Sequence, residues 1–382
     1  MDDLQLDALL TEMGEDFRAS HTHIPVRRER TPRRLWVPVL AAAATVAVVV
    51  AVTVSLPEKK RSAPPVTTGP VQHALTIPKV TAVAVNDRWV LVSGGTTGKL
   101  SHEGFEVHRR DDWKHVVRGA THYPLGGMAC PLILGDTLLW VDSEEVETEL
   151  VPGPATHQAL WQMDLLTGRE TRLLEELPAE AGPTRIPCPY GENGTVAWQR
   201  LNFGPPGSPD RVTIREVRTS ATHTVSVPAR DELIGFTDGR LLLQHGSAIS
   251  STDPATGGEG VTLVPSGTLT QTAASDGRLV WITYRKSAET QDGIDVHVCS
   301  LPACSDKRLL GSDDGAARPV MGTTFTAYTS LPASAVIRRF DGKVVEPLTD
   351  ETVSFVTFAA FGDTFAFVSG DDNAQVLHLV QP

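Results

Sequence analysis

Basic charge is scarce in this sequence. Its 382 residues hold 34 Lys and Arg against 46 Asp and Glu, which gives a formal net charge of −12. Residues 62–382 alone contain 25 basic and 38 acidic side chains. A domain of this sign repels phosphate backbones and gains nothing from counterion release. We therefore expect no nucleic-acid partner.

Signatures of common enzymes and metal sites are also missing. The sequence contains no G-x-S-x-G, H-E-x-x-H or C-x-x-C motif. Residues 93–100, SGGTTGKL, lack the first glycine and the Ser/Thr of a phosphate-binding loop. His21 and His23 have no third ligand nearby, and the acidic pairs at 313–314 and 371–372 lack the oxygen spacing of a calcium loop. We therefore expect no cofactor, no metal and no catalytic residue that a motif would reveal.

Long apolar runs are absent except for one. Residues 35–56 form 22 residues without a charge, and at about 1.5 Å per residue they reach across a hydrocarbon core of about 30 Å. Five arginines between 27 and 34 precede the run. The positive-inside rule then predicts a single transmembrane helix with residues 1–34 in the cytoplasm and the C-terminal bulk outside. The main alternative is a cleaved secretory signal, which usually has a shorter apolar stretch and leader.

The cytoplasmic segment 1–34 contains one amphipathic pattern. Its apolar residues recur at the spacing of one helix face, and they are Leu6, Leu9, Leu10, Met13 and Phe17. A helix this short is marginal alone in water, so we expect this stripe either to bind a partner protein or to belong to a frayed tail. Residues 57–70 are rich in proline, threonine and charge, which predicts a solvated linker.

Residues 71–382 repeat one short pattern seven times. Asn, Gly or Asp comes first, Arg or Thr comes third, and an apolar residue comes fourth. The matches are NDRWVLV (86–92), GDTLLWV (135–141), NGTVAWQ (193–199), DGRLLLQ (238–244), DGRLVWI (276–282), GTTFTAY (322–328) and GDTFAFV (362–368). The mean spacing is 46 residues, and a period of about 40–50 with several short strands per unit is typical of a β-propeller blade.

The repeat predicts an all-β, seven-bladed β-propeller over 71–382, with four strands in each blade. After the seventh match only QVLHLV (375–380) remains as a strand, so the last blade lacks its outermost member. HALTI (73–77) precedes the first blade and has no other sheet to join, so we expect it to close the ring by pairing into blade seven. The alternatives are a pair of β-sandwiches or a six-bladed ring with one false match.

The four cysteines fit this repeat. An even number in an oxidising compartment predicts two disulfides. Cys130 and Cys188 each precede a repeat by five residues and are followed by proline, so we expect them on the inner strands of neighbouring blades. Cys299 and Cys304 flank a hairpin turn between the third and fourth strands of blade five, where a bridge would close a short loop.

Two family resemblances extend these predictions. Through the repeated motif and the third-strand sequence WQMDLLTG (161–168), residues 71–382 resemble TolB-like or WD40-like propellers. The acidic leader, the arginine-rich stop and the Ala/Val-rich span of residues 1–56 are similar to those of actinobacterial single-pass proteins with an external propeller. Such proteins are often encoded beside extracytoplasmic-function sigma factors. The resemblance implies a regulatory role and a cytoplasmic sigma factor as a partner.

Three functions remain open at this point. The first is a membrane-anchored, extracytoplasmic binding or sensor module that signals through its tail to a cytoplasmic partner. The second is an extracytoplasmic enzyme, for example a carbohydrate-active one, with its site at the propeller axis. The third is an envelope scaffold that uses the propeller rim. Carboxylates gathered at one mouth of the ring would favour the enzyme.

Overall fold

The structure, a computed structural model, describes residues 71–382 apart from residues 76 and 78 and several connections. These connections are 96–101, 124–126, 145–146, 149–150, 153–156, 177–187, 201–208, 256–259, 265–268, 286–292, 314–318, 331–333, 346–352 and 372–373. The predictions for residues 1–70 therefore lie outside the described residues. Among the described residues, no helix is long and apolar enough to cross a membrane.

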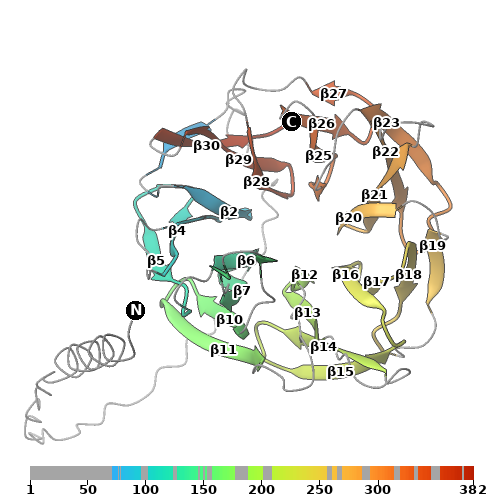
Figure 1. Cartoon of the computed structure of the whole chain (residues 1–382), viewed down its shortest axis with the longest axis horizontal. Helices are drawn as coiled ribbons and strands as arrows, with labels where there is room; N and C mark the ends of the chain where they lie inside the picture. Colours follow the sequence, from blue (N-terminus) through green and yellow to red (C-terminus); the bar gives the residue numbers. More distant parts are fainter. Residues whose placement is uncertain are drawn as a thin grey trace, which may run out of the picture. The chain divides into compact units, whose positions relative to one another are not determined.

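Seven four-stranded antiparallel sheets are arranged around one axis, as predicted (Figure 1). The first strand of each blade lies nearest the axis. Blades one to three are formed by β2 (Val80–Val85), β3 (Trp89–Gly94), β4 (Gly104–Arg109) and β5 (Val116–Ala120); by β6 (Gly127–Leu134), β7 (Thr137–Glu144), β10 (His157–Asp164) and β11 (Arg169–Glu176); and by β12 (Tyr190–Glu192), β13 (Thr195–Arg200), β14 (Asp210–Glu216) and β15 (Thr222–Val227).

The remaining blades follow in chain order. Blades four to six are formed by β16 (Glu232–Thr237), β17 (Arg240–His245), β18 (Ala248–Thr252) and β19 (Val261–Val264); by β20 (Leu269–Ser275), β21 (Arg278–Arg285), β22 (Gly293–Ser300) and β23 (Arg308–Asp313); and by β24 (Val320–Met321), β25 (Phe325–Ser330), β26 (Ser334–Arg339) and β27 (Val344–Val345). A separate two-stranded hairpin, β8 (Glu147–Thr148) and β9 (Val151–Pro152), lies between β7 and β10 in the chain.

Blade seven is completed by the start of the propeller, which confirms the predicted ring closure. Its sheet order is β1-β30-β29-β28, with β1 (Val71–Ala74), β28 (Val353–Phe361), β29 (Thr364–Asp371) and β30 (Ala374–Val380). β1 pairs antiparallel with β30, from Val71 opposite Leu379 to Ala74 opposite Val376. The closing strand begins two residues earlier than the HALTI segment suggests and ends within it.

The first two residues of the repeated pattern make a tight turn between the first and second strands of a blade. Asp276 and Gly277 have φ of 48° and 67°, which matches the twist of the flanking strands and favours glycine and aspartate. Asn193-Gly194 and Asp238-Gly239 adopt the same conformation.

The third residue of the pattern joins several blades to the next one. Arg88 donates to the Asp136 carboxylate in the turn of blade two, at 2.7 Å. Arg278 donates to the backbone carbonyl of Thr323 in blade six at 2.6 Å. Thr324 donates to Asp363 in blade seven at 2.9 Å. The repeated Arg or Thr therefore makes a hydrogen bond to the next blade in addition to its role at the start of a strand.

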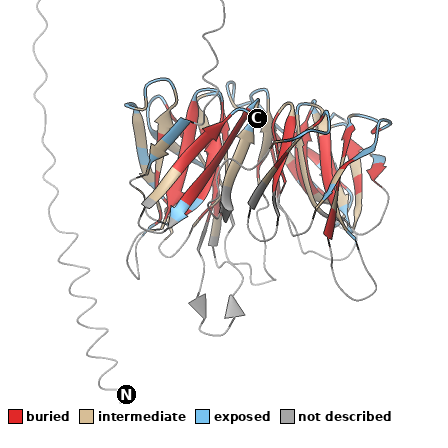
Figure 2. Ribbon diagram, turned by 90° about the horizontal axis from the view of Figure 1, so that it is seen from above, coloured by how far each residue is buried: buried red, intermediate tan, exposed pale blue. Residues whose placement is uncertain are grey.

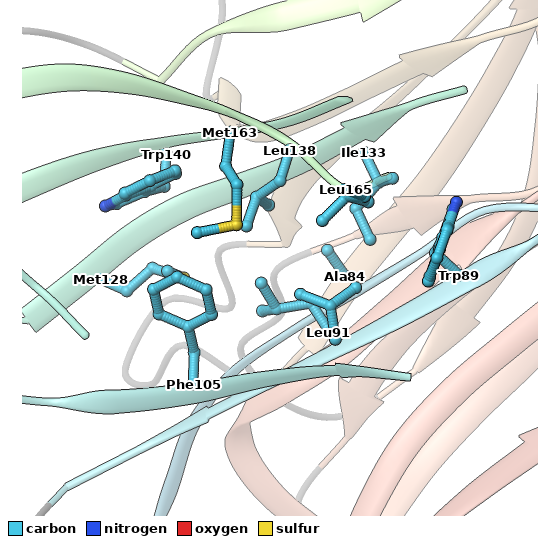
Figure 3. Close-up of a cluster of buried hydrophobic side chains, with 11 residues drawn as sticks. Ala84, Trp89, Leu91, Phe105, Met128, Ile133, Leu138, Trp140, Met163 and Leu165 are labelled. Atoms are coloured by element: carbon cyan, nitrogen blue, oxygen red, sulfur yellow. The ribbon is translucent and has the colours of Figure 1, made fainter. Parts of the chain in front are cut away.

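The apolar fourth residue and its neighbours on the second strand fill the space between blades. Figure 3 shows the cluster between blades one and two, where Leu91 and Phe105 of blade one face Leu138, Trp140 and Met163 of blade two, all buried. Seen from the side, buried residues run along the strands and exposed residues gather in the connections at the edge of the ring (Figure 2). Burial of this kind stabilises the fold by about 25 cal/mol per Å² of apolar surface.

Candidate binding face

The two ends of the propeller differ in their connections. In each antiparallel blade, the first-to-second and third-to-fourth strand connections lie at one end, here called the turn face. Those from the second to the third strand and from one blade to the next lie at the other end, here called the loop face. On the turn face the first-to-second strand turns have two or three residues, as at 193–194 and 276–277, and the third-to-fourth connections reach eight residues at 253–260. The loop face has short turns such as 246–247 and also the longest connections, which are 95–103, 145–156, 177–189 and 201–209. β30, the third strand of blade seven, ends at the turn face. Because β1 pairs antiparallel with it, the chain enters the propeller at that face.

Carboxylates do gather near the axis on the turn face, but they hold the blades together. Asp136 accepts from Arg88 and from the Trp89 indole N–H at 2.8 Å. Glu192 accepts from the backbone N–H of Asp238 at 2.6 Å and from that of Asp276 at 2.8 Å, which links blade three to blades four and five. Because their oxygens are engaged in this way, these carboxylates explain ring assembly better than catalysis at the axis.

The predicted disulfides are both present. Cys130 and Cys188 are bridged with Cα atoms 5.3 Å apart. Cys130 lies in a β-bulge of β6, the inner strand of blade two, and Cys188 lies two residues before β12 of blade three. Cys299 and Cys304 are bridged with Cα atoms 5.0 Å apart in the turn between β22 and β23. The first bridge joins two blades, and the second closes one hairpin.

A histidine–aspartate pair lies on the loop face between blades three and four. The Nδ1 atom of His245, at the end of β17, is 2.8 Å from Oδ1 of Asp231 in the connection between β15 and β16. The His245 side chain is 68% exposed, whereas that of Asp231 is 9% exposed. The buried Gln199 amide donates to the Asp231 backbone carbonyl at 2.6 Å and accepts from the N–H of Leu233 at 2.6 Å. A buried residue therefore positions the acid, and the acid orients an exposed imidazole.

A second histidine cluster lies at the same face between blades one and two. His122, in the connection from β5 to β6, stacks on Trp161 with ring centroids 3.6 Å apart and an interplanar angle of 7°. Its Nδ1 is 3.2 Å from Asp142 and its Nε2 is 2.9 Å from Glu170. The His122 backbone N–H also donates to Asp142.

Both ring nitrogens of His122 face a carboxylate oxygen, one of Asp142 and one of Glu170. Burial raises the pKa of Asp142 above its ordinary value, although the bonds from His122 oppose the shift. Since both nitrogens of His122 are engaged, this histidine braces the joint between blades, and His245 is the one that offers a nitrogen to solvent.

Sequence reasoning located only part of this face. The predicted tail residues Leu6, Leu9, Leu10, Met13 and Phe17 lie outside the described residues. His122, Asp142 and Glu170 are separated by 20 and 28 positions, and His245 follows Asp231 by 14, so no local motif marks them. Only knowledge of the strand registers could have shown that these side chains lie close together. Within the described part of the chain, no group of three or more His, Cys, Asp or Glu side chains could hold a metal ion.

Comparison with known proteins identifies the fold. No protein-family model and no curated protein matches the chain. The propeller domain of the Trilobed protease from Pyrococcus furiosus, described as having an open velcro topology, matches with a TM-score of 0.55 and 10% identity over 79% of this chain and 95% of that domain. An acylaminoacyl peptidase from Pyrococcus horikoshii matches with a TM-score of 0.52 and 9% identity over 77% of this chain and 49% of its own.

A further acylaminoacyl peptidase, in complex with Z-Gly-Gly-Phe-chloromethyl ketone, matches with a TM-score of 0.54 and 10% identity. This chain spans about half the length of each acylaminoacyl peptidase, 49% and 51%. At such identity the likeness concerns the fold alone. Unlike the open velcro topology described for the protease domain, the ring here is closed by β1. The chain therefore contains a seven-bladed β-propeller closed by its own first strand.

Proposed function

We propose that this protein is a membrane-anchored binding or sensor module whose propeller lies outside the cytoplasm and takes its ligand on the loop face. In this proposal residues 35–56 span the membrane and residues 57–70 connect the span to β1. Two disulfides support an oxidising compartment for the propeller. The ligand is an extracellular molecule or protein, and no nucleic acid is involved.

The observation that carries the proposal is the difference between the two faces. On the turn face, the turn side chains Asp136, Glu192 and Thr324 are engaged in contacts between blades. The loop face carries the longer connections and the exposed, acid-oriented imidazole of His245. Binding residues are found disproportionately on loops held by a rigid scaffold.

The cytoplasmic half of the proposal concerns the apolar stripe of the tail. We propose that Leu6, Leu9, Leu10, Met13 and Phe17 form the face of a short helix that contacts a cytoplasmic protein, with a sigma factor as the first candidate. The support is the helical spacing of these residues and the resemblance of residues 1–56 to actinobacterial single-pass proteins. Ligand binding outside would then be coupled to this contact.

One crosslinking experiment tests both halves in the full-length chain in its native cells. A photo-crosslinking amino acid replaces His245 on the loop face, Leu166 on the turn face, or Leu10 in the tail. Leu166 is a matched control, because it is 60% exposed and His245 is 68% exposed. We expect His245 to capture an extracytoplasmic molecule and Leu10 a cytoplasmic protein, while Leu166 captures neither.

Equal crosslinking from Leu166 and His245 would contradict the assignment of the loop face. Crosslinks from His245 to cytoplasmic proteins would contradict the membrane topology. The enzyme alternative, with a site at the axis, is disfavoured by the structural engagement of Asp136, Glu192 and Asp276. A scaffold that used the rim would crosslink instead from the exposed rim residues Val261 and Leu309 on outermost strands.

A further inference from the structure

The closing strand β1 is held by its ladder with β30, and Leu75, directly after it, packs against the apolar cluster that joins blades seven and one. Three of its four residues are exposed, and only His73 is partly buried. Beyond the strand, the backbone N–H of Leu75 donates to the Gln375 carbonyl at 2.9 Å, and the N–H of Val80 donates to the Gln375 side chain at 2.8 Å. Within β1 itself, His73 is therefore the side chain that packs against the rest of the ring.

His73 packs on an aromatic side chain of blade one. Its ring stacks on Trp113 with centroids 3.4 Å apart. Trp113 lies in the turn between β4 and β5 and packs against the apolar cluster that joins blades seven and one. His108 of β4 also contacts Trp113, with centroids 5.5 Å apart. Three rings thus connect the closing strand to the first blade.

Each imidazole in this group has one nitrogen that is buried without a hydrogen-bond partner, Nε2 in His73 and Nδ1 in His108. A neutral imidazole has one unprotonated ring nitrogen, and this nitrogen can occupy a buried position that lacks a hydrogen-bond partner. A protonated imidazole would put an N–H donor there, and a buried donor without an acceptor is destabilising because it has lost its hydrogen bond to water. Protonation of both rings would also place two positive charges around Trp113.

The charged groups around the rings do not offset this cost. Glu106 on β4 lies 3.1 Å from Nε2 of His108, and its other oxygen accepts from Arg118 of β5 at 2.8 Å. In the turn, Asp112 accepts from the backbone N–H groups of Lys114 and His115. On β30, His378 stands opposite Gln72, and its Nε2 is 2.6 Å from Ser369.

The pKa shifts agree with this geometry. Burial lowers the pKa of His73, and the neighbouring His108 lowers it further. Burial also lowers the pKa of His108, and this effect outweighs the opposing effect of Glu106. A base whose pKa is lower in the closed ring takes up protons more readily once the strand is free. The closure is therefore most stable above the ordinary histidine pKa of about 6.5 and weakens as the pH falls below it.

We propose that the ring closure is an acid-released latch, in which protonation of His73 and His108 frees β1 from β30 while the other six blades stay folded. The proposal does not depend on the proposed function. It concerns an equilibrium within the propeller and would hold for any ligand.

Hydrogen–deuterium exchange of the full-length chain tests the latch at about pH 7.5 and about pH 5.5. Exchange of the peptide that contains β1 is compared with that of β21–β22 in blade five, after correction for the intrinsic effect of pH. We expect the relative exchange of β1 to rise by roughly threefold or more at the lower pH. His73→Phe keeps a ring on Trp113 but cannot take up a proton there, so its β1 exchange should depend much less on pH than that of the wild type.

Two further variants keep the outcome decisive. Ala74→Cys combined with Val376→Cys, oxidised, locks β1 to β30 and should abolish the pH dependence. His108→Asn removes one of the two protonation sites and should reduce it. The proposal is overturned if wild-type β1 exchanges at the same relative rate at both pH values, or if His73→Phe responds to acid as strongly as wild type.

Discussion

Arg338→Ala is expected to destabilise the propeller by about 3 kcal/mol, because it leaves a largely buried carboxylate without its ion-pair partner. Nη2 of Arg338 lies 2.9 Å and 2.8 Å from the two carboxylate oxygens of Asp313, and its Nε donates to the Tyr328 hydroxyl at 2.6 Å. The side chains of Arg338 and Asp313 are only 12% and 19% exposed, and Tyr328 is fully buried. This network joins blade five to blade six.

The protonation states of the network fit this account. Burial raises the pKa of Tyr328 far above its ordinary value, and its bond to Asp313 raises it further, so the phenol stays neutral and donates. Burial alone would lower the pKa of Arg338, but its bonds to Tyr328 and Asp313 outweigh that effect and the guanidinium remains charged. Gly311 leaves the space for it, since a Cβ there would lie 2.4 Å from the Arg338 guanidinium carbon.

Urea unfolding of the purified full-length chain, followed by tryptophan fluorescence, measures this effect. Arg109→Ala is the control, because Arg109 pairs with Asp111 at 2.9 Å with side chains 40% and 60% exposed, and such pairs contribute about 0–1 kcal/mol. Tyr328→Phe keeps the ion pair and should cost about 1 kcal/mol. Equal destabilisation by Arg338→Ala and Arg109→Ala would show that the network does not brace the two blades.

Loss of the Cys130–Cys188 disulfide is expected to cost about 4 kcal/mol, and loss of Cys299–Cys304 only about 2 kcal/mol. The reason is the length of chain that each bridge closes in the unfolded state. The sequence separation is 58 residues for the first pair and 5 for the second. Constraint of the longer loop removes more entropy from the unfolded chain, and the first bridge also joins two blades.

The double serine variants Cys130→Ser/Cys188→Ser and Cys299→Ser/Cys304→Ser provide the comparison. Each is unfolded in urea beside the wild-type chain under oxidising conditions, and the three free energies of unfolding are compared. The pair that closes the short hairpin is the matched control, since it removes the same atoms. A larger loss from the 299–304 variant than from the 130–188 variant would contradict the loop-length argument.

Much of the fold follows from the sequence because the blades repeat. The turn Asp276-Gly277 and the apolar residues after it recur at a regular spacing, so one turn and one strand could be recognised seven times. The closing strand could be predicted from the number of strands per blade, because the last blade lacked one strand that the segment before the first blade could supply. Short strands such as β24, with two residues, have hardly any alternation by which to recognise them.

The polar groups of the candidate face could not be found in this way. The pairing of His245 with Asp231 depends on how the connection between β15 and β16 meets the end of β17. His122 reaches Asp142 and Glu170 from another blade. Such contacts arise from the placement of neighbouring sheets, which local patterns do not encode. The disulfides were the exception, because the repeat itself placed Cys130 and Cys188 at equivalent positions.

Disulfide trapping between β1 and β30 tests the central claim, that the two ends of the propeller close one ring. Ala74 and Val376 face each other across the pair of strands, whereas Gln375 is one position out of register and its side chain lies on the other face. Oxidised full-length chain carrying Ala74→Cys and Val376→Cys should yield a peptide that links residue 74 to residue 376, while Ala74→Cys with Gln375→Cys should not. Absence of the 74–376 link, or equal linkage in both variants, would contradict a closed seven-bladed ring.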